Sequence, residues 1–245
     1  TVGIGIPGFS SNETGLVTNA NSMWLNDKPF KKDLETALKR EVKLMNDANC
    51  FTLSEAVDGA GKDYQSIFGI IIGTGFGGAL SYKKEIIEGA NQIAGDWGHQ
   101  PLPYPTKEEI ETKINCPSMN CGRPLCAEQF MSGIGFKDVF NQKNNTNFSS
   151  EEIVQLDLDG DPRANLELSL YEDRMARLMA VMIGIFDPDA IILGGGMSNI
   201  DRLYKNIPAL IPKYTFSNKV ITKVIKNFHG DSSGVRGAAW LWNNV

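Results

Sequence analysis

The sequence predicts an α/β protein of two similar lobes with a cleft between them. Units of strand, glycine turn and helix occur in both halves, as in residues 71–80 (IIGTGFGGAL) and 189–199 (DAIILGGGMSN). The chain has 245 residues, which is long for one domain and suits two lobes. We place the boundary at the charged break of residues 59–63, which gives a first lobe of residues 1–62 and a second of residues 63–245.

Four elements are expected in the first lobe. Residues 1–8 (TVGIGIPG) have the pattern of a buried strand that ends at a Pro-Gly turn. The apolar spacing of residues 31–40 predicts an amphipathic helix, residues 42–45 a short strand, and residues 49–60 a second helix. Because a strand rarely opens a domain so abruptly, we expect further residues upstream of Thr1.

The second lobe begins with the glycine-rich stretch of residues 71–80. Gly73, Gly75 and Gly78 read as G-x-G-x-x-G, a weak signal for a dinucleotide-binding turn, which requires a helix directly afterwards. The residues that follow instead alternate between apolar and polar, so we predict a strand, a glycine turn and a second strand. The backbone N–H groups of such a turn can bind an anion. On the residues alone, a phosphate site and a plain hairpin turn both remain open.

The rest of the second lobe is a loop followed by helices. Residues 89–128 form a long segment with few regular elements, and residues 189–199 a buried strand that runs into three glycines. The helix of residues 165–186 carries an apolar stripe, which we expect to be buried. The stripe consists of Leu166, Leu170, Met175, Leu178, Met182 and Ile185. Other helices are expected at residues 128–141, 150–157 and 201–214 and in the tail HGDSSGVRGAAWLW.

Composition argues against several classes of protein. The formal net charge of -5 and the absence of a Lys/Arg block longer than a pair give no electrostatic footprint for nucleic acid or for a membrane surface. No apolar run approaches the roughly 20 residues of a membrane span. Four cysteines are too few for a disulfide scaffold, so we expect a reducing, cytoplasmic setting.

Asn46 and Asp47 come directly after a predicted strand. The ends of strands are where α/β proteins build their sites, and an aspartate there can act as general base toward a hydroxyl. Asn-Asp is also a common helix cap, and the residues alone leave both roles open.

His99, Cys116, Cys121 and Cys126 form a candidate metal site. The cysteines have the spacing C-x4-C-x4-C, and a histidine lies upstream in a chain that has two. Four such ligands suit tetrahedral Zn²⁺, which would hold a loop with few regular elements. The alternative is that they are scattered buried thiols.

Several segments together resemble the ROK family of sugar kinases, and the resemblance covers the whole chain. They are GIGIPG, NANSMWLN, NDANC, IIGTGFGGAL, GDWGH, CGRPLC with Glu128, DPDAIILGGGMSN and HGDSSGVRGAAWLW. Within the family, NANSMWLNDKPF and the tail are most similar to bacterial fructokinases of the manno(fructo)kinase type.

The resemblance implies an actin-like, ribonuclease H-like fold of two lobes that binds Mg²⁺, ATP and a hexose in its cleft. The implied reaction is phosphorylation of a hexose hydroxyl, fructose to fructose 6-phosphate first, with mannose, glucose or N-acetylglucosamine as alternative sugars. A sugar-sensing ROK transcriptional regulator is the other alternative. A homodimer is expected. The family's D-x-G-G-T phosphate segment is not in this sequence, so we expect the first lobe to be incomplete at its N-terminus and the chain alone to be inactive.

The resemblance also assigns roles to residues of this chain. Asp47 is the implied catalytic base. The implied sugar-binding residues are Gly8, Asn21, Asn46, Asp96, His99 and Glu128. The implied nucleotide-binding residues are Gly73, Thr74, Gly75, Gly77, Gly194, Gly195 and Gly196. The implied ligands of a structural zinc are His99, Cys116, Cys121 and Cys126.

The chain departs from the family pattern at three places. Asp96 stands where family members have Glu, which shortens a sugar-contacting side chain by one methylene. In the zinc motif Met119 occupies the first cysteine position, and Cys116 lies three residues earlier. Leu125 replaces a glycine of the same motif.

Overall fold

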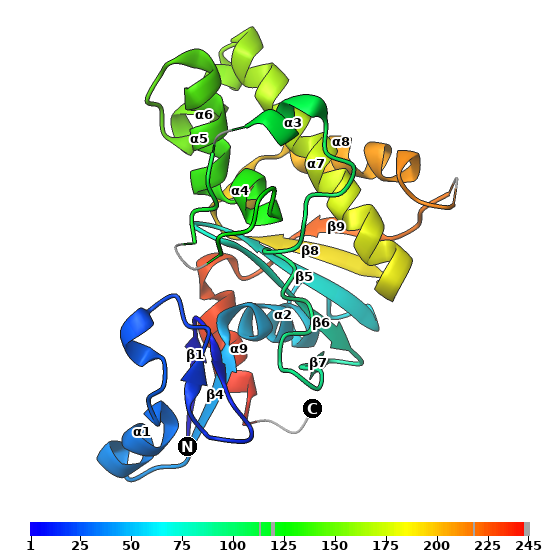
Figure 1. The fold of residues 1–245 in the computed structure, drawn as a ribbon. Helices are drawn as coiled ribbons and strands as arrows, with labels where there is room; N and C mark the ends of the chain where they lie inside the picture. Colours follow the sequence, from blue (N-terminus) through cyan, green and yellow to red (C-terminus); the bar gives the residue numbers. More distant parts are fainter. Residues whose placement is uncertain (113, 119–120, 218, 243–245) are drawn as a thin grey trace.

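Five strands form the central sheet of the computed structural model, in the order β7-β6-β5-β8-β9 (Figure 1). The structure describes residues 1–112, 114–118, 121–217 and 219–242, so Met119 lies outside it. β5 pairs antiparallel with β6 and parallel with β8. The strands are β5 (Ser66–Ile72), β6 (Phe76–Tyr82), β7 (Glu85–Ile87), β8 (Ala190–Gly194) and β9 (Lys223–Lys226).

Helices cover both faces of this sheet (Figure 1). Side chains of a strand alternate between faces, and in β5 Phe68 and Ile70 join the core beneath the helices of the second half of the chain, whereas Ile67 packs with Phe51 of α2. The sheet is therefore buried on both sides. The helices are α2 (Asp47–Val57) and, on the opposite face, α4 (Ala127–Met131), α5 (Gly133–Asn144), α6 (Ser150–Leu158), α7 (Pro162–Phe186) and α8 (Arg202–Leu210).

A smaller unit precedes α2 in the chain. β1 (Val2–Ile6) and β4 (Val42–Asn46) pair in parallel, and their register places Ile6 opposite Asn46. The hairpin of β2 (Phe9–Ser10) and β3 (Val17–Thr18) lies beside them, and α1 (Phe30–Leu38) leads into β4.

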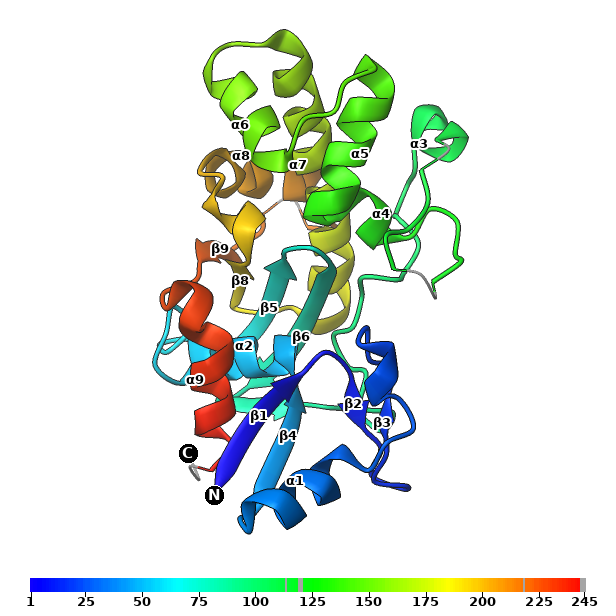
Figure 2. The same ribbon diagram turned by 90° about the vertical axis from the view of Figure 1, so that its left-hand side faces the viewer.

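The tail helix α9 (Ser233–Trp240) packs against α2 and β1 (Figure 2). Two glycines permit this approach: a Cβ built on Gly237 would lie 1.7 Å from the Cys50 carbonyl oxygen, and one on Gly3 would lie 1.8 Å from that of Ala238. The last helix thus packs closely against the first strand. The lobe boundary between residues 62 and 63 stays a prediction.

The expected glycine hairpin is confirmed, because Ile72 pairs with Phe76 across residues 73–75. The single helix expected at residues 128–141 is wrong in one respect. It is divided at Ser132, whose hydroxyl accepts the backbone N–H of Gly135 and so caps α5. β9 was not expected, because its four residues are too few to show a clear alternation of apolar and polar side chains.

The expected burial of the α7 stripe is correct only in the middle of the helix. Met175 and Leu178 are buried, whereas Leu166 is 61% and Ile185 78% exposed. Arg174 and Arg177, each 2% exposed, occupy the buried face, because the carboxylate of Glu109, from another segment, pairs with both. Among the described residues, no helix combines the length and the apolar character that crossing a membrane requires.

Candidate active site

Asp47 lies at the junction of β4 and α2. The preceding residue, Asn46, caps the helix: its side-chain oxygen accepts the backbone N–H groups of Ala48 at 2.9 Å and Asn49 at 3.3 Å. The capping alternative is therefore correct for Asn46. Asp47 accepts the N–H of Ala48 at 2.8 Å and still faces open space.

The pKa of Asp47 lies above the usual value of an aspartate. Water reaches the side chain from the cleft, but the surrounding protein removes part of its hydration, which raises the pKa, and the nearby charge of Asp96 acts in the same direction. The N–H of Ala48 partly opposes the shift. A carboxylate of this kind is a better proton acceptor than one in water.

A cleft of about 350 Å³ opens in front of Asp47 and brings together residues from distant parts of the sequence. It is bounded on one side by the turn after β1 and the end of β4, and on the other by the glycine hairpin and the loop after β7. The predicted site residues that line it are Gly8, Asn21, Asn46, Asp47, Gly73, Thr74, Gly75, Gly77, Asp96, His99 and Glu128.

The glycine hairpin presents bare backbone to this cleft. A Cβ on Gly73 or on Gly77 would meet no atom within 4 Å, so a ligand can approach both positions closely. The carbonyl of Gly73 accepts the N–H of Gly133 at 2.8 Å, which fixes the turn to the start of α5. The hairpin thus has the rigidity and openness of an anion site, and its ligand stays a prediction.

The three glycines after β8 lie in different surroundings. A Cβ on Gly194 would lie 2.3 Å from the Phe51 ring, and Gly195 has a φ of 82° and packs on the Ile72 carbonyl. These two glycines serve backbone packing and do not line the cleft. Gly196 lines a neighbouring pocket of about 690 Å³, together with Gly73 and Thr74 of the hairpin. The pocket and the cleft share Gly73 and Thr74 as lining residues.

Two further carboxylates stand opposite Asp47. Glu128 is 4% exposed, and its Oε2 accepts the N–H of Phe76 at 3.1 Å while its Oε1 accepts the Ser118 hydroxyl. Asp96 is open to the cleft. Partial burial raises its pKa, the interaction with His99 opposes the shift, and the charge of Glu128 adds to it.

Asp96→Glu tests whether the shorter side chain loosens the grip on sugar. If the loop has not moved inward, the added methylene should restore one hydrogen bond and tighten sugar binding by about 1 kcal/mol. Isothermal titration of the full-length protein measures the change. Asp63→Glu, a matched change outside the cleft, should leave affinity unchanged. Weaker binding by Asp96→Glu would show that the site is adapted to aspartate.

His99 and three cysteines converge beside the cleft. Their ligand atoms all lie within 4.8 Å of one another, and Cys116 Sγ is 3.9 Å from His99 Nδ1. Two paired backbone segments bring them together, since Leu102 N–H donates to the Leu125 carbonyl at 2.8 Å. The donor set suits a tetrahedral metal, and Cys116 belongs to the cluster despite its shifted position.

Leu125 shows why the family has glycine there. Its φ is 56°, in the left-handed region that β-carbon-bearing residues adopt at a cost. The chain accepts this strain next to Cys126, which indicates that the loop conformation is over-determined by its other contacts.

Sequence reasoning missed some residues of the cleft. Asn19 and Asn49 line it, and both stand in segments already singled out, NANSMWLN and NDANC, so the signal was present. The contact of Ser118 with Glu128 had no signal, because it depends on how the loop folds. The other histidine of the chain, His229, does not belong to the metal cluster, and its Nε2 lies 2.9 Å from the Asp58 carboxylate.

Comparison with known proteins gives three findings. A family model described as ROK family matches residues 1–245. The chain is 38% identical over 241 residues to an N-acetyl-D-glucosamine kinase of Vibrio cholerae, a match that covers 98% of this chain and 80% of the relative. Two solved structures have a TM-score of 0.82 at 24% identity and cover 98% of this chain: a ROK hexokinase from Thermus thermophilus (78% of that chain) and a ROK family glucokinase from Streptomyces griseus in complex with glucose and AMPPNP (80%).

Proposed function

The chain belongs to the ROK family and is a sugar kinase of actin-like α/β fold, and from this premise we propose that its substrates are ATP and N-acetyl-D-glucosamine. One observation carries the proposal: Asp47, the glycine hairpin and the carboxylates Asp96 and Glu128 line a single cleft. That arrangement places a base, a phosphate site and sugar-binding groups within reach of one another.

Asp47 is the proposed general base. It takes the proton of a sugar hydroxyl, the 6-hydroxyl in our proposal, as that oxygen attacks the γ-phosphorus and ADP leaves. Phosphoryl transfer depends on positioning and charge stabilisation more than on covalent chemistry, so a base, oriented N–H groups and a closing cleft suffice. Mg²⁺ bound with ATP would neutralise charge on the phosphates. Closure of the cleft would exclude water and limit wasteful hydrolysis of ATP.

The hairpin N–H groups at Gly73, Thr74 and Gly75 are the proposed phosphate contacts. The pocket beside Gly196 is the proposed place of the adenosine, since it meets the cleft at the hairpin. Asn46 and Asp96 are proposed to hold sugar hydroxyls, with His99 and Glu128 on the side of the metal loop.

A structural zinc is the proposed occupant of the cluster of His99, Cys116, Cys121 and Cys126. All four residues would be ligands, so the metal would have no open position for catalysis. Its proposed role is to fix the loop that carries His99, which lines the cleft as well as the metal cluster.

The two resemblances of this chain indicate different sugars. The relatives that share about 38% of the sequence are N-acetyl-D-glucosamine kinases, whereas NANSMWLNDKPF and the tail favoured a fructokinase. We give the relatives precedence because they match nearly the whole chain, and fructose stays the alternative.

ADP release by the full-length protein should be fastest with N-acetyl-D-glucosamine. A site built for the acetamido group rejects a sugar that lacks it, so kcat/KM for fructose, mannose and glucose should each be lower by at least about tenfold. A higher value for fructose would overturn the sugar assignment and keep the kinase. Sugar binding with no ADP release on any sugar would favour the sugar-sensing body of a regulator.

A further inference from the structure

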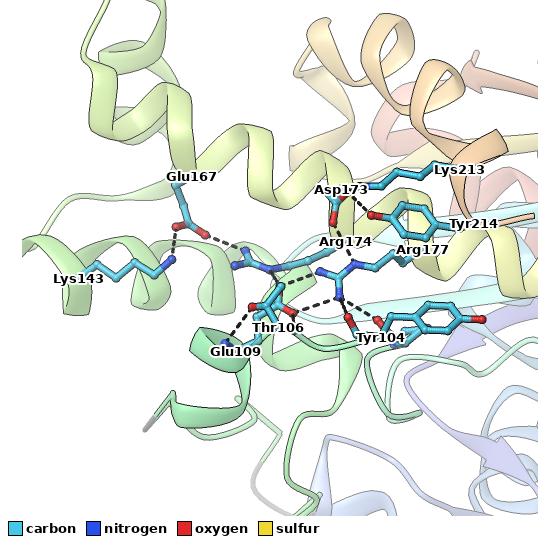
Figure 3. A network of polar contacts seen from close by, with 11 residues as sticks. Tyr104, Thr106, Glu109, Lys143, Glu167, Asp173, Arg174, Arg177, Lys213 and Tyr214 are labelled. Atoms are coloured by element: carbon cyan, nitrogen blue, oxygen red, sulfur yellow. Dashed lines mark hydrogen bonds and ion pairs between the residues drawn. The ribbon is translucent and has the colours of Figure 1, made fainter.

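An ion-pair cluster (Figure 3) joins α7 to the metal loop, the segment between residues 102 and 125 that carries Cys116 and Cys121. Its centre is Glu109 of the short helix α3 (Lys107–Glu111), which is 4% exposed. Two arginines of α7 reach it: Glu109 Oε1 accepts Arg174 Nε and Arg177 Nη2, each at 2.7 Å. Neither the proposed reaction nor the proposed metal site accounts for three buried charges at this position.

The cluster fastens the loop to α7 at more than one atom. Arg177 Nη1 also donates to the backbone carbonyls of Pro103 and Tyr104, each at 2.8 Å. The other oxygen of Glu109 accepts the N–H of Thr106 at 2.8 Å, which closes a capping box on α3. Residues 103–109 are therefore held by side chain and backbone together.

Glu109 lies in the first half of the loop, beyond the paired segments at its base. Residues 98–102 pair with residues 125–128 at the base of the loop, through the Leu102 to Leu125 and Glu128 to Gly98 hydrogen bonds. The chain between these segments leaves the sheet and carries Cys116 and Cys121. Glu109 is the buried charged contact that ties its first half to a long, rigid helix.

Arg174 also contacts the short helix that carries Glu128. Its guanidinium lies 5.2 Å from the centre of the Phe130 ring, in the same short helix α4 as Glu128. One arginine thus contacts both the metal loop and the helix that presents a cleft carboxylate.

We propose that the cluster of Glu109, Arg174 and Arg177 is a positioning device that fixes the metal loop against α7. It thereby determines where the proposed sugar-binding residues beside this loop lie in the cleft. The inference rests on the proposed function, because it assigns the loop a part in holding metal and sugar. Glu109 touches neither, so it is a positioning residue and not a catalytic one.

Glu109 is ionised at neutral pH. Burial alone would raise its pKa, but hydrogen bonds from Arg177, Thr106 and Arg174 lower the pKa to about 2. The arginines would not be left alone if this charge were removed. Arg174 keeps an ion pair with Glu167 at 2.7 Å, and Arg177 keeps one with Asp173 at 3.1 Å. Glu109→Gln should therefore fold while the anchor loosens.

Glu167→Gln is the matched control. Glu167 is a buried carboxylate of the same network, but it joins Arg174 to Lys143 of α5 and makes no hydrogen bond or ion pair with the described residues of the loop (Figure 3). Both variants lose one buried charge from α7's network. A general loss of stability would affect them alike, whereas loosening of the loop is expected only when Glu109, the carboxylate of the two that belongs to the loop, is replaced.

Hydrogen exchange of the full-length protein tests the inference without reference to activity or metal. Peptides from residues 103–126 should exchange at least about tenfold faster in Glu109→Gln and within twofold of wild type in Glu167→Gln. In zinc-loaded protein, the rate of zinc release to a colorimetric chelator should follow the same pattern. KM for the sugar should rise in Glu109→Gln while KM for ATP stays unchanged.

Unchanged exchange of these peptides in Glu109→Gln, or equal acceleration in both variants, would overturn the inference. Wild-type protein that holds no zinc would instead contradict the proposed metal site, and the exchange result would still decide the positioning role. If Glu109→Gln does not fold, Arg177→Lys serves in its place, because lysine keeps the charge but cannot span the two carbonyls and the carboxylate together.

Discussion

Asp47→Asn is expected to lower kcat for sugar phosphorylation by roughly 10²- to 10⁴-fold and to leave the affinity for sugar nearly unchanged. The substitution keeps the shape of the side chain and its contact with the N–H of Ala48, but an amide cannot take a proton from the sugar hydroxyl. Steady-state ADP release gives kcat, and calorimetry gives the dissociation constant of the sugar.

Asp58→Asn is the control for this experiment. Asp58 lies at the other end of α2, where it pairs with His229 and Arg236 outside the cleft. Its substitution should leave kcat within about twofold. Turnover by Asp47→Asn equal to that of wild type would remove Asp47 as the base.

The same assignment fixes the sign of the pH dependence. The base acts when ionised, and the folded protein raises the pKa of Asp47 above its ordinary value, chiefly by burial. Activity should therefore fall as pH decreases through that raised pKa, at a higher pH than the ordinary aspartate value of about 3.9 would give. An acid limb at or below the ordinary value would contradict the assignment.

The sequence predicted the parts of the fold that local patterns govern. Alternation identified the β5–β6 hairpin, because the period of residues 76–82 is that of a strand. Apolar spacing and Asp187-Pro188 identified α7 and its end. The same reasoning misjudged which face of α7 is buried, since Arg174 and Arg177 enter the interior where Glu109, from a distant segment, pairs with both of them.

The candidate site was predicted residue by residue through the ROK resemblance, whose family membership is confirmed, while its fructokinase subtype is not confirmed. The contacts among those residues could not be predicted. Glu128 accepts a hydrogen bond from Phe76 across the hairpin and another from Ser118 in the loop, and both depend on tertiary packing. Gly194 and Gly196 are only two residues apart in the sequence, yet one packs on Phe51 and the other lines a pocket.

Removal of the metal is expected to abolish sugar binding as well as loop structure. Metal-replete protein should contain about one zinc per chain. Cys121→Ser should lose it, because a site of four ligands loses much of its affinity for the metal when one thiolate is replaced. Elemental analysis measures the metal. Cys50→Ser is the matched control: Cys50 is buried in α2 away from the four-residue cluster, so its substitution should leave the zinc content unchanged.

Sugar binding should be lost with the metal because the cleft and the metal share residues. His99 belongs to both, and the Ser118 hydroxyl that donates to Glu128 lies between Cys116 and Cys121 in the loop. Once the loop is released, the buried carboxylate of Glu128 loses that partner, at a cost of about 1 to 3 kcal/mol for a buried group left unsatisfied. Addition of zinc to chelated wild type should restore binding, and sugar affinity that survives complete removal of zinc would refute the link. Cys116→Ser tests the fourth ligand. Stoichiometric zinc in that variant would show that Cys116 Sγ, 3.9 Å from His99 Nδ1, is not a ligand of the metal.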